Sequence, residues 1–369
     1  MVRLKEKFTG CIAASWVGSA MGAAVEGWSR EAIEEKYGFL DRLLPYSHYS
    51  GEWKREPGTT EDGIERQKLI ATAIIEKQDR VLAQDVAAVW VRDIDLAKIV
   101  HKQEAFDKAL LELARAGLPP SELGKLFLYP NVVSLARSSH PLGLINAGDP
   151  KGAADDALEI GKLYARETAY ALRWAALYDA AIAEACRPGA TVASVLEVAR
   201  EYVHYRREGA LLYAGYDTIE WEVNHALELA SKHTDPMAMR DEFYQHYHGG
   251  DYFNYSMSQA NEIVAKGLAV FAITKGNPKE AILTAVNFGR DTDCLGAVAG
   301  GLAGALSGPA ALPQEWIEQV NAATKADPYT NNYRTIGETA QGLYEAFLAR
   351  RDRMKKYMDE MAGNNYLDE

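Results

Sequence analysis

Residues 287–308 read NFGRDTDCLGAVAGGLAGALSG, so two carboxylates stand directly before a long segment without any charge. Burying an uncompensated carboxylate is costly, and the group takes up a proton unless something positive lies near it. Asp291 and Asp293 therefore require a basic side chain, a helix N-terminus or a metal ion, and Arg290 is the one basic residue within the stretch. A plainer alternative is that both aspartates simply cap the helix that follows.

Small residues recur every fourth position in this segment and in residues 8–25. The repeated positions are Gly10, Ala14, Gly18 and Gly22 in one segment and Gly296, Gly300, Gly304 and Gly308 in the other. This spacing forms a smooth strip on one helix face, although each glycine costs a helix ~1 kcal/mol relative to alanine. We expect the two helices to pack closely at the centre, with Glu26 near Asp291 and Asp293.

The composition indicates an acidic protein with a large core. The 369 residues are 48% hydrophobic and carry a formal charge of −12 without a basic block, which argues against a nucleic-acid partner. Three separated cysteines, Cys11, Cys186 and Cys294, favour a reducing compartment, and we predict a cytoplasmic protein. The apolar stretches 8–25 and 294–314 predict buried core helices, because glycine and alanine dominate them, and no membrane partner is expected.

Helical patterns run through most of the chain and predict an all-α, single-domain, multi-helix bundle over residues 1–369. Helices are expected after a cap at Thr191, over 218–233 and over 336–361, and a long alanine-rich segment from about residue 152 ends at Pro188 and Gly189. A threonine cap after Pro57 predicts another helix start near residue 60. No β-hairpin pattern and no fixed repeat stand out.

A second acidic cluster comprises Thr60, Glu61 and Asp62. Taken alone, it fits a helix whose first-turn carboxylates suit the macrodipole. Taken with Asp291 and Asp293, it offers four carboxylates and one hydroxyl, the ligands that hard divalent cations prefer. Two such ions would explain why these like charges tolerate an apolar neighbourhood.

Three blocks of the chain, at 8–27, 57–75 and 287–308, resemble in the same order the signature blocks of the ADP-ribosylglycohydrolase family. They read GCIAASWVGSAMGAAVEG, PGTTEDGIERQKLIATAII and NFGRDTDCLGAVAGGLAGALSG within those ranges, with a weaker middle block, HPLGLINAGDP. The resemblance implies an all-α bundle with two Mg²⁺ or Mn²⁺ ions in a central cleft. It also implies hydrolysis of the glycosidic bond that joins ADP-ribose to arginine, serine or related groups.

The resemblance implies roles for individual residues. The implied metal ligands are Thr60, Glu61, Asp62, Asp291, Asp293 and Cys294. The implied catalytic residues are Glu26, as base or water-orienting group, with Asp62 and Asp293, because nearby carboxylates stabilise an oxocarbenium-like transition state. The implied substrate-binding residues are Ser138, Ser139, His140, Gly249, Gly250 and Tyr252.

The sequence departs from the family pattern at several of these positions. Glu61 stands where the family has aspartate, and Cys294 replaces a metal-binding threonine, although a thiol is a poor ligand for Mg²⁺. Ser19 replaces an acidic residue, and Ser138 occupies the expected arginine position within NVVSLARSSHPLG at 131–143. The metal-binding half of the pattern is therefore better preserved than the substrate-binding half, which leaves the substrate open.

Several alternatives remain open at this point. The enzyme could hydrolyse another small N- or O-glycoside such as a nucleoside, or the chain could be a catalytically silent binder of ADP-ribose or a nucleotide. A zinc site at His246, His248 and Asp251 is disfavoured, because histidines two apart diverge on a helix. The aromatic loop around Tyr252 suits a ligand wall, and its partner is expected to be a small molecule or an ADP-ribosylated substrate.

Overall fold

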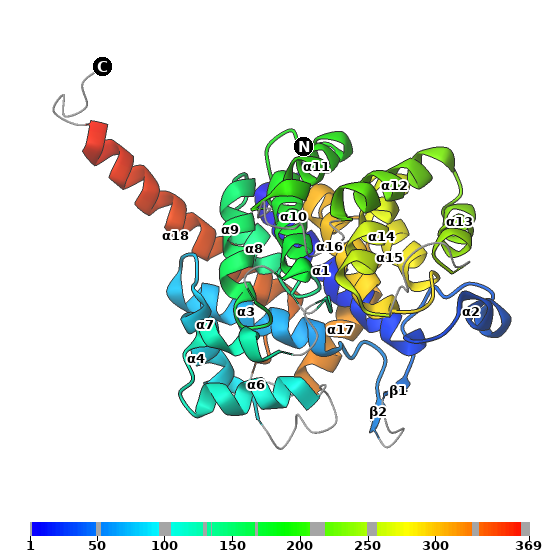
Figure 1. Ribbon diagram of the computed structural model, residues 1–369, viewed down its shortest axis with the longest axis horizontal. Helices are drawn as coiled ribbons and strands as arrows, with labels where there is room; N and C mark the ends of the chain where they lie inside the picture. The colour runs from blue at the N-terminus through cyan, green and yellow to red at the C-terminus, as the bar shows by residue number, and fades with distance from the viewer. Residues whose placement is uncertain are drawn as a thin grey trace.

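The computed structural model describes residues 2–48, 53–95, 105–127, 131–133, 135–166, 169–206, 218–248, 257–326 and 332–362. Helices dominate this part of the chain (Figure 1), so the all-α prediction is confirmed. The first half contains α1 (Leu4–Gly22), η1 (Ala23–Val25), α2 (Arg30–Tyr37), β1 (Tyr46–His48), β2 (Trp53–Arg55), α3 (Asp62–Lys77), α4 (Ala83–Asp93), α6 (Ala105–Arg115), α7 (Pro120–Leu123), η2 (Gly124–Leu126), α8 (His140–Ile145), α9 (Pro150–Gly161) and α10 (Tyr170–Ala185). The second half contains α11 (Val192–Glu201), η3 (Tyr202–His204), α12 (Ile219–Lys232), α13 (Pro236–His248), α14 (Ala260–Ile273), α15 (Pro278–Val286), α16 (Thr292–Ser307), α17 (Gln314–Ala326) and α18 (Ile336–Ala362).

Helices α1 and α16 form the central pair, as the glycine spacing predicts. They run antiparallel with their backbones in contact, and the contacts are Gly10 with Gly304, Ala14 with Gly300, Gly18 with Gly296 and Gly22 with Thr292. A Cβ atom at Gly300 would lie 2.7 Å from the carbonyl oxygen of Ala14, so glycine is required for this approach. The pairing brings the C-terminal end of α1 beside the N-terminal end of α16.

Burial accounts for the apolar character of α1. By length and composition the segment Leu4–Val25 passes as a membrane span, yet 89% of its most apolar window is buried inside the protein. Figure 1 shows α1 crossing the middle of the molecule beneath the outer helices. Its side chains belong to one hydrophobic cluster that extends over most of the described helices. The prediction of one domain over the whole chain stays a prediction.

The alanine-rich segment after residue 152 forms two helices, α9 and α10, because the chain turns after Gly161. The expectation that the chain has no β-hairpin was wrong. A short antiparallel hairpin, β1–β2, exists, with Tyr46 opposite Arg55. Its three-residue strands are too short for an alternating hydrophobic pattern to reveal them. The expected helices beginning near 192, 218 and 336 are present.

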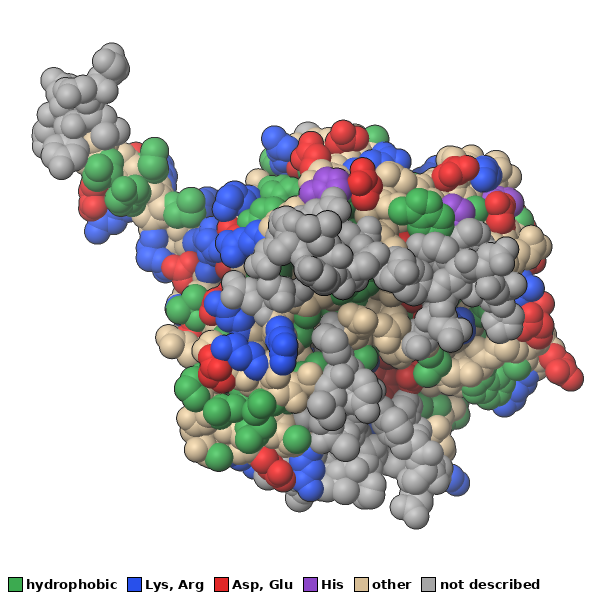
Figure 2. All heavy atoms as spheres, viewed as in Figure 1, with side chains coloured by type: hydrophobic (Ala, Val, Ile, Leu, Met, Phe, Trp, Pro, Cys, Tyr) green, Lys and Arg blue, Asp and Glu red, His purple; other side chains and the backbone are tan. Residues whose placement is uncertain are grey.

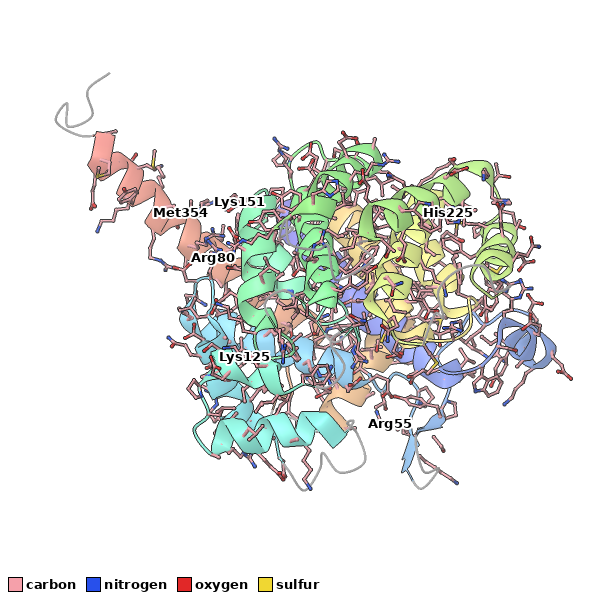
Figure 3. The ribbon with its side chains drawn as sticks, in the orientation of Figure 1. Arg55, Arg80, Lys125, Lys151, His225 and Met354 are labelled. Carbon is pink, nitrogen blue, oxygen red and sulfur yellow. The ribbon has the colours of Figure 1, made fainter. Side chains whose placement is uncertain are left out.

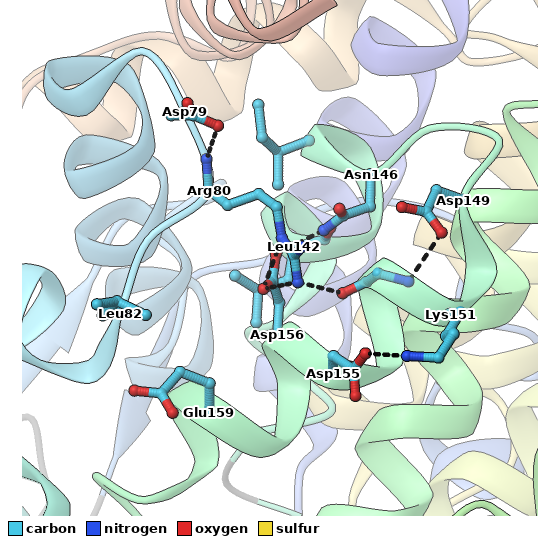
Figure 4. A network of polar contacts seen from close by, with 12 residues as sticks. Asp79, Arg80, Leu82, Leu142, Asn146, Asp149, Lys151, Asp155, Asp156 and Glu159 are labelled. Carbon is cyan, nitrogen blue, oxygen red and sulfur yellow. Dashed lines mark hydrogen bonds and ion pairs between the residues drawn. The ribbon is translucent and has the colours of Figure 1, made fainter. Parts of the chain in front are cut away.

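A polar network ties the outer helices together on the side of the molecule where α18 leaves the body (Figure 4). Arg80, in the loop after α3, donates to both carboxylate oxygens of Asp156 on α9, at 2.9 Å each. Asn146 donates to the same carboxylate at 2.6 Å, and Arg350 of α18 donates to the side-chain oxygen of Asn146 at 2.8 Å. Beyond this anchor α18 projects from the body, and Met354 lies on its exposed part (Figure 3).

Candidate active site

The first two acids of the site lie at the start of α16. Asp291 is the N-cap residue, and its Oδ1 accepts a hydrogen bond from the backbone N–H of Cys294 at 3.3 Å. The capping alternative is therefore right for Asp291. Its Oδ2 is nevertheless buried and has no hydrogen-bond partner in the described part of the chain, and the same holds for Oδ1 of Asp293. The two carboxyl groups lie close enough to hydrogen-bond when Asp293 holds a proton, and loss of that proton leaves one oxygen of each available to a ligand.

Glu26 approaches these acids because the chain after α1 pairs with the loop before α16. The backbone N–H of Gly27 donates to the carbonyl of Arg290 at 2.7 Å, and the N–H of Arg290 donates back to the carbonyl of Trp28 at 2.7 Å. Glu26 is half-buried beside this pair. Burial, with the charges of Glu26 and Asp291, raises the pKa of Asp293 well above its usual range. The expected proximity of Glu26 to the two aspartates is confirmed.

Cys294 completes a compact group with these aspartates. One ligand atom from each of Asp291, Asp293 and Cys294 lies within 4.8 Å of the others, and all three residues are buried. Burial is the first cause that raises the pKa of the Cys294 thiol, and the neighbouring aspartates add to it. A thiol that keeps its proton is a weak nucleophile and a weak metal ligand. This argues against a role for Cys294 as a catalytic nucleophile.

Glu61 is held by the hairpin rather than left open to an ion. The Tyr46 hydroxyl donates to Glu61 Oε1 at 2.5 Å, and Nη1 of Arg55 lies 3.1 Å from the same oxygen. Figure 3 marks Arg55 at the hairpin, and its side chain is buried together with that of Glu61. The unexpected hairpin therefore supplies the counter-charge for the glutamate that departs from the family pattern.

Asp62 has two arginine partners. Nη2 of Arg137 lies 2.7 Å from Asp62 Oδ2, and Nη2 of Arg66 lies 3.3 Å from the same oxygen. Arg137 also directs Nη1 toward the sulfur of Cys294 at 3.3 Å. The two acidic clusters, about 230 positions apart in sequence, therefore do converge, and the guanidinium of Arg137 contacts both of them.

Arg137 is the residue that sequence reasoning missed. Arg137 lies within residues 131–143, directly before Ser138, the residue that we expected at the arginine position of the family pattern. Gly63 provides a signal for it in hindsight, because a Cβ at Gly63 would lie 2.8 Å from Cδ of Arg137. A glycine directly after the acidic pair thus gives the arginine side chain room to cross the start of α3.

Thr60 is not the helix cap that we expected. Glu61 is the N-cap of α3, without a side-chain capping bond. The hydroxyl of Thr60 donates to Glu65 Oε1 at 3.4 Å, and Nζ of Lys68 lies 2.5 Å from that oxygen. The threonine therefore belongs to a buried polar chain beneath the site.

The segment Ser138–His140, predicted to bind substrate, is buried and bonded to the core. The hydroxyl of Ser138 donates to the carbonyl of Leu135 at 3.0 Å, and that of Ser139 donates to Asp179 at 2.7 Å. Both ring nitrogens of His140 are engaged, and burial lowers its pKa to about 4. These hydrogen bonds anchor the three side chains to the core. Their role in substrate binding stays a prediction. Gly249, Gly250 and Tyr252 lie outside the described residues, as does Asp251.

Acidic side chains are visible at the floor of a hollow near the C-terminal end of α1 (Figure 2). The donor set of the site fits one divalent cation, because Asp291 and Asp293 carry buried oxygens without partners. The carboxylates of Glu61 and Asp62 are already neutralised by arginines. The predicted count of two ions stays a prediction.

The protein is an all-α bundle with buried carboxylates at the junction of its two central helices. The family model for ADP-ribosylglycohydrolase matches residues 1–353, and the chain belongs to that family. It is 24% identical over 347 residues to the uncharacterized protein YegU of Escherichia coli (strain K12), covering 89% of this chain and 96% of YegU. A solved structure titled ADP-ribosylglycohydrolase-related protein complex matches with a TM-score of 0.62 and 19% identity, covering 94% of this chain and all of that one. The structural match supports the fold.

Proposed function

We propose that the protein is a divalent-metal-dependent hydrolase that cleaves the glycosidic bond of an ADP-ribosylated substrate or a related ADP-ribose derivative. One observation carries the proposal: Asp291 and Asp293 present buried, unpartnered oxygens at one point of a chain of this family. Leaving such groups unsatisfied costs stability unless a ligand uses them. The partner is a small molecule or an ADP-ribosylated molecule, and the proposed location is the cytoplasm.

The side chains support a division of roles in the reaction. Glu26, half-buried at the edge of the acidic group, is placed to orient a water molecule and accept its proton. The carboxylates of Asp291 and Asp293 would stabilise positive charge that develops at the anomeric carbon as the bond to the leaving group lengthens. A bound divalent cation would supply Lewis acidity and fix neighbouring sugar hydroxyls.

The test is turnover by the full chain on a substrate panel. ADP-ribosyl-arginine, ADP-ribosyl-serine and several nucleosides are incubated with Mn²⁺ or Mg²⁺, and products are separated and identified by mass. Release of ADP-ribose that stops on addition of a chelator supports the proposal. Asp293→Ala and Asp62→Ala are assayed with excess metal, and full activity in both would end it.

A second candidate is hydrolysis of a smaller N- or O-glycoside such as a nucleoside. It is favoured by the inward hydrogen bonds of Ser138 and Ser139, which occupy the segment expected to hold ADP-ribose. Release of ribose or a free base, without release of ADP-ribose, would select this candidate. Binding of ADP-ribose without any metal-dependent turnover would instead select a silent binding protein.

A further inference from the structure

The charges around the site nearly balance before any ion is added. Five carboxylates gather there, from Glu26, Glu61, Asp62, Asp291 and Asp293, and three guanidiniums accompany them, from Arg55, Arg66 and Arg137. With every carboxyl deprotonated, as a bound cation requires of its ligands, the remainder is two negative charges, which one divalent cation neutralises. A second divalent cation would leave the buried group with a surplus of positive charge, and buried excess charge is strongly unfavourable.

The groups behind the site make a second ion even less favourable. Glu262 is buried and has two cationic neighbours, because Nε of Arg290 lies 2.6 Å and Nζ of Lys266 lies 2.5 Å from its Oε1. This triad carries one net positive charge, and Lys266 is close enough to Asp291 for their charges to interact. The triad therefore adds to the cost of any positive charge beyond that of the first cation.

The free oxygens are distributed unevenly between the two clusters. At the start of α16, Oδ2 of Asp291 and Oδ1 of Asp293 are buried without hydrogen-bond partners in the described part of the chain. At the start of α3, Oε1 of Glu61 and Oδ2 of Asp62 each have at least one arginine within 3.1 Å. Among the described residues, the α16 cluster thus has two buried carboxylate oxygens without a hydrogen-bond partner, whereas each α3 carboxylate is paired with an arginine.

We infer that this protein binds one divalent cation at Asp291 and Asp293, and that the guanidinium of Arg137 takes the place of a second one. The inference rests on the proposed divalent-cation site. Arg137 lies between Asp62 and Cys294, where it bonds an oxygen on one side and a sulfur on the other. A guanidinium forms charge-assisted bonds to a carboxylate and tolerates a thiol, whereas hard divalent cations select oxygen.

Gly63 leaves the space that the side chain of Arg137 occupies. The Cδ and Cγ atoms of Arg137 would lie 2.8 and 3.1 Å from a Cβ at that glycine, so any other residue would push the side chain away. The pairing of Arg137 with Asp62, the exchange of threonine for Cys294 and the absence of a Cβ at Gly63 act together. The first two features remove oxygen ligands from a second ion site. The missing Cβ leaves room for the guanidinium at that site.

The experiment counts ions in the metal-stripped full chain. Mn²⁺ is added in equilibrium dialysis, bound metal is measured by mass spectrometry, and electron paramagnetic resonance separates an isolated ion from a coupled pair. We expect one ion per chain and an uncoupled spectrum for the wild type. Two ions with a coupled spectrum would overturn the inference, and so would binding of none.

Variants test whether Arg137 is the reason. Arg137→Met combined with Cys294→Thr is expected to bind two ions with a coupled spectrum, whereas the exposed Arg353→Met keeps one. Should the double variant fail to fold, Gly63→Ala displaces the guanidinium without removing it and is expected to admit a second ion. If folded Gly63→Ala binds only one Mn²⁺ ion per chain, the inference is contradicted.

The ion count tests the one-ion inference, and turnover tests the proposed function, so either can fail without the other. A wild type with two coupled ions that hydrolyses the glycoside panel would overturn the one-ion inference and leave the proposed function intact. A wild type with one ion that hydrolyses nothing would do the reverse.

Discussion

Gly18 of α1 and Gly296 of α16 touch backbone to backbone, and each occupies the space that a Cβ on the other would need. This contact sets the distance between the two central helices. It thereby sets the separation between Glu26, just beyond α1, and Asp293, at the start of α16. The apolar core and the acidic site consequently depend on the same pair of glycines.

Gly18→Ala is expected to lower the free energy of unfolding by about 1–3 kcal/mol, because the added methyl meets backbone that cannot turn away. Urea unfolding followed by circular dichroism measures the change. Gly337→Ala is the matched control, since nothing lies near a Cβ there and α18 gains about 0.5–1 kcal/mol of helix propensity. Equal stability of the two variants would contradict close packing of α1 against α16.

The sequence was sufficient to predict the central helix pair and the convergence of the two acidic clusters, because both follow from strong local signals. Glycines at a spacing of four and carboxylates beside apolar segments keep their meaning in almost any fold. The partners of those carboxylates were not predictable in this way. Arg55 and Arg137 reach Glu61 and Asp62 through a three-residue strand and an irregular segment, neither of which has a periodic pattern.

Arg55→Met is expected to destabilise the fold by about 3–5 kcal/mol, because it removes a guanidinium that neutralises the buried carboxylate of Glu61. Denaturant unfolding at neutral pH measures the loss. The ion pair of Arg42 with Asp41 is exposed, so Arg42→Met is expected to change stability by less than about 0.5 kcal/mol. Similar small effects in both variants would show that Arg55 does not neutralise a buried charge.

His140 gives the fold an acid-sensitive component. Its pKa is about 4 in the folded protein, against 6.5 for an ordinary histidine, because burial disfavours the charged ring. The unfolded chain therefore binds more protons between these values, and stability falls as the pH drops from about 6.5 to about 4. The full loss from this one residue is about 3 kcal/mol.

His140→Gln is expected to remove that component, so the difference in unfolding free energy between wild type and variant shrinks as the pH falls from 7 to 4. Denaturant titrations at several pH values measure this difference, and other titrating groups cancel from it. Gln67 donates to Nδ1 of His140, and Nε2 faces the carbonyl of Ala297, so the variant also loses hydrogen bonds at neutral pH. A difference independent of pH would contradict a buried neutral histidine.

Asp293→Asn is expected to stabilise the metal-free protein while abolishing turnover. The carboxyl of Asp293 is buried near Glu26 and Asp291, and one of its oxygens has no partner in the described residues. An amide removes the repulsion and is expected to add about 1 kcal/mol to the unfolding free energy in the presence of a chelator. Thermal unfolding with and without chelator measures the change.

The exposed Asp359→Asn serves as the control, with an expected change of less than about 0.5 kcal/mol and unaltered turnover. Added Mn²⁺ should raise the unfolding temperature of the wild type and of this control but not that of Asp293→Asn, because a ligand stabilises only the folded state that binds it. If Asp293→Asn loses stability in chelator, contacts within the metal-free fold stabilise the carboxylate of Asp293, and it does not need a cation. That result would remove the physical reason for placing the ion at the start of α16.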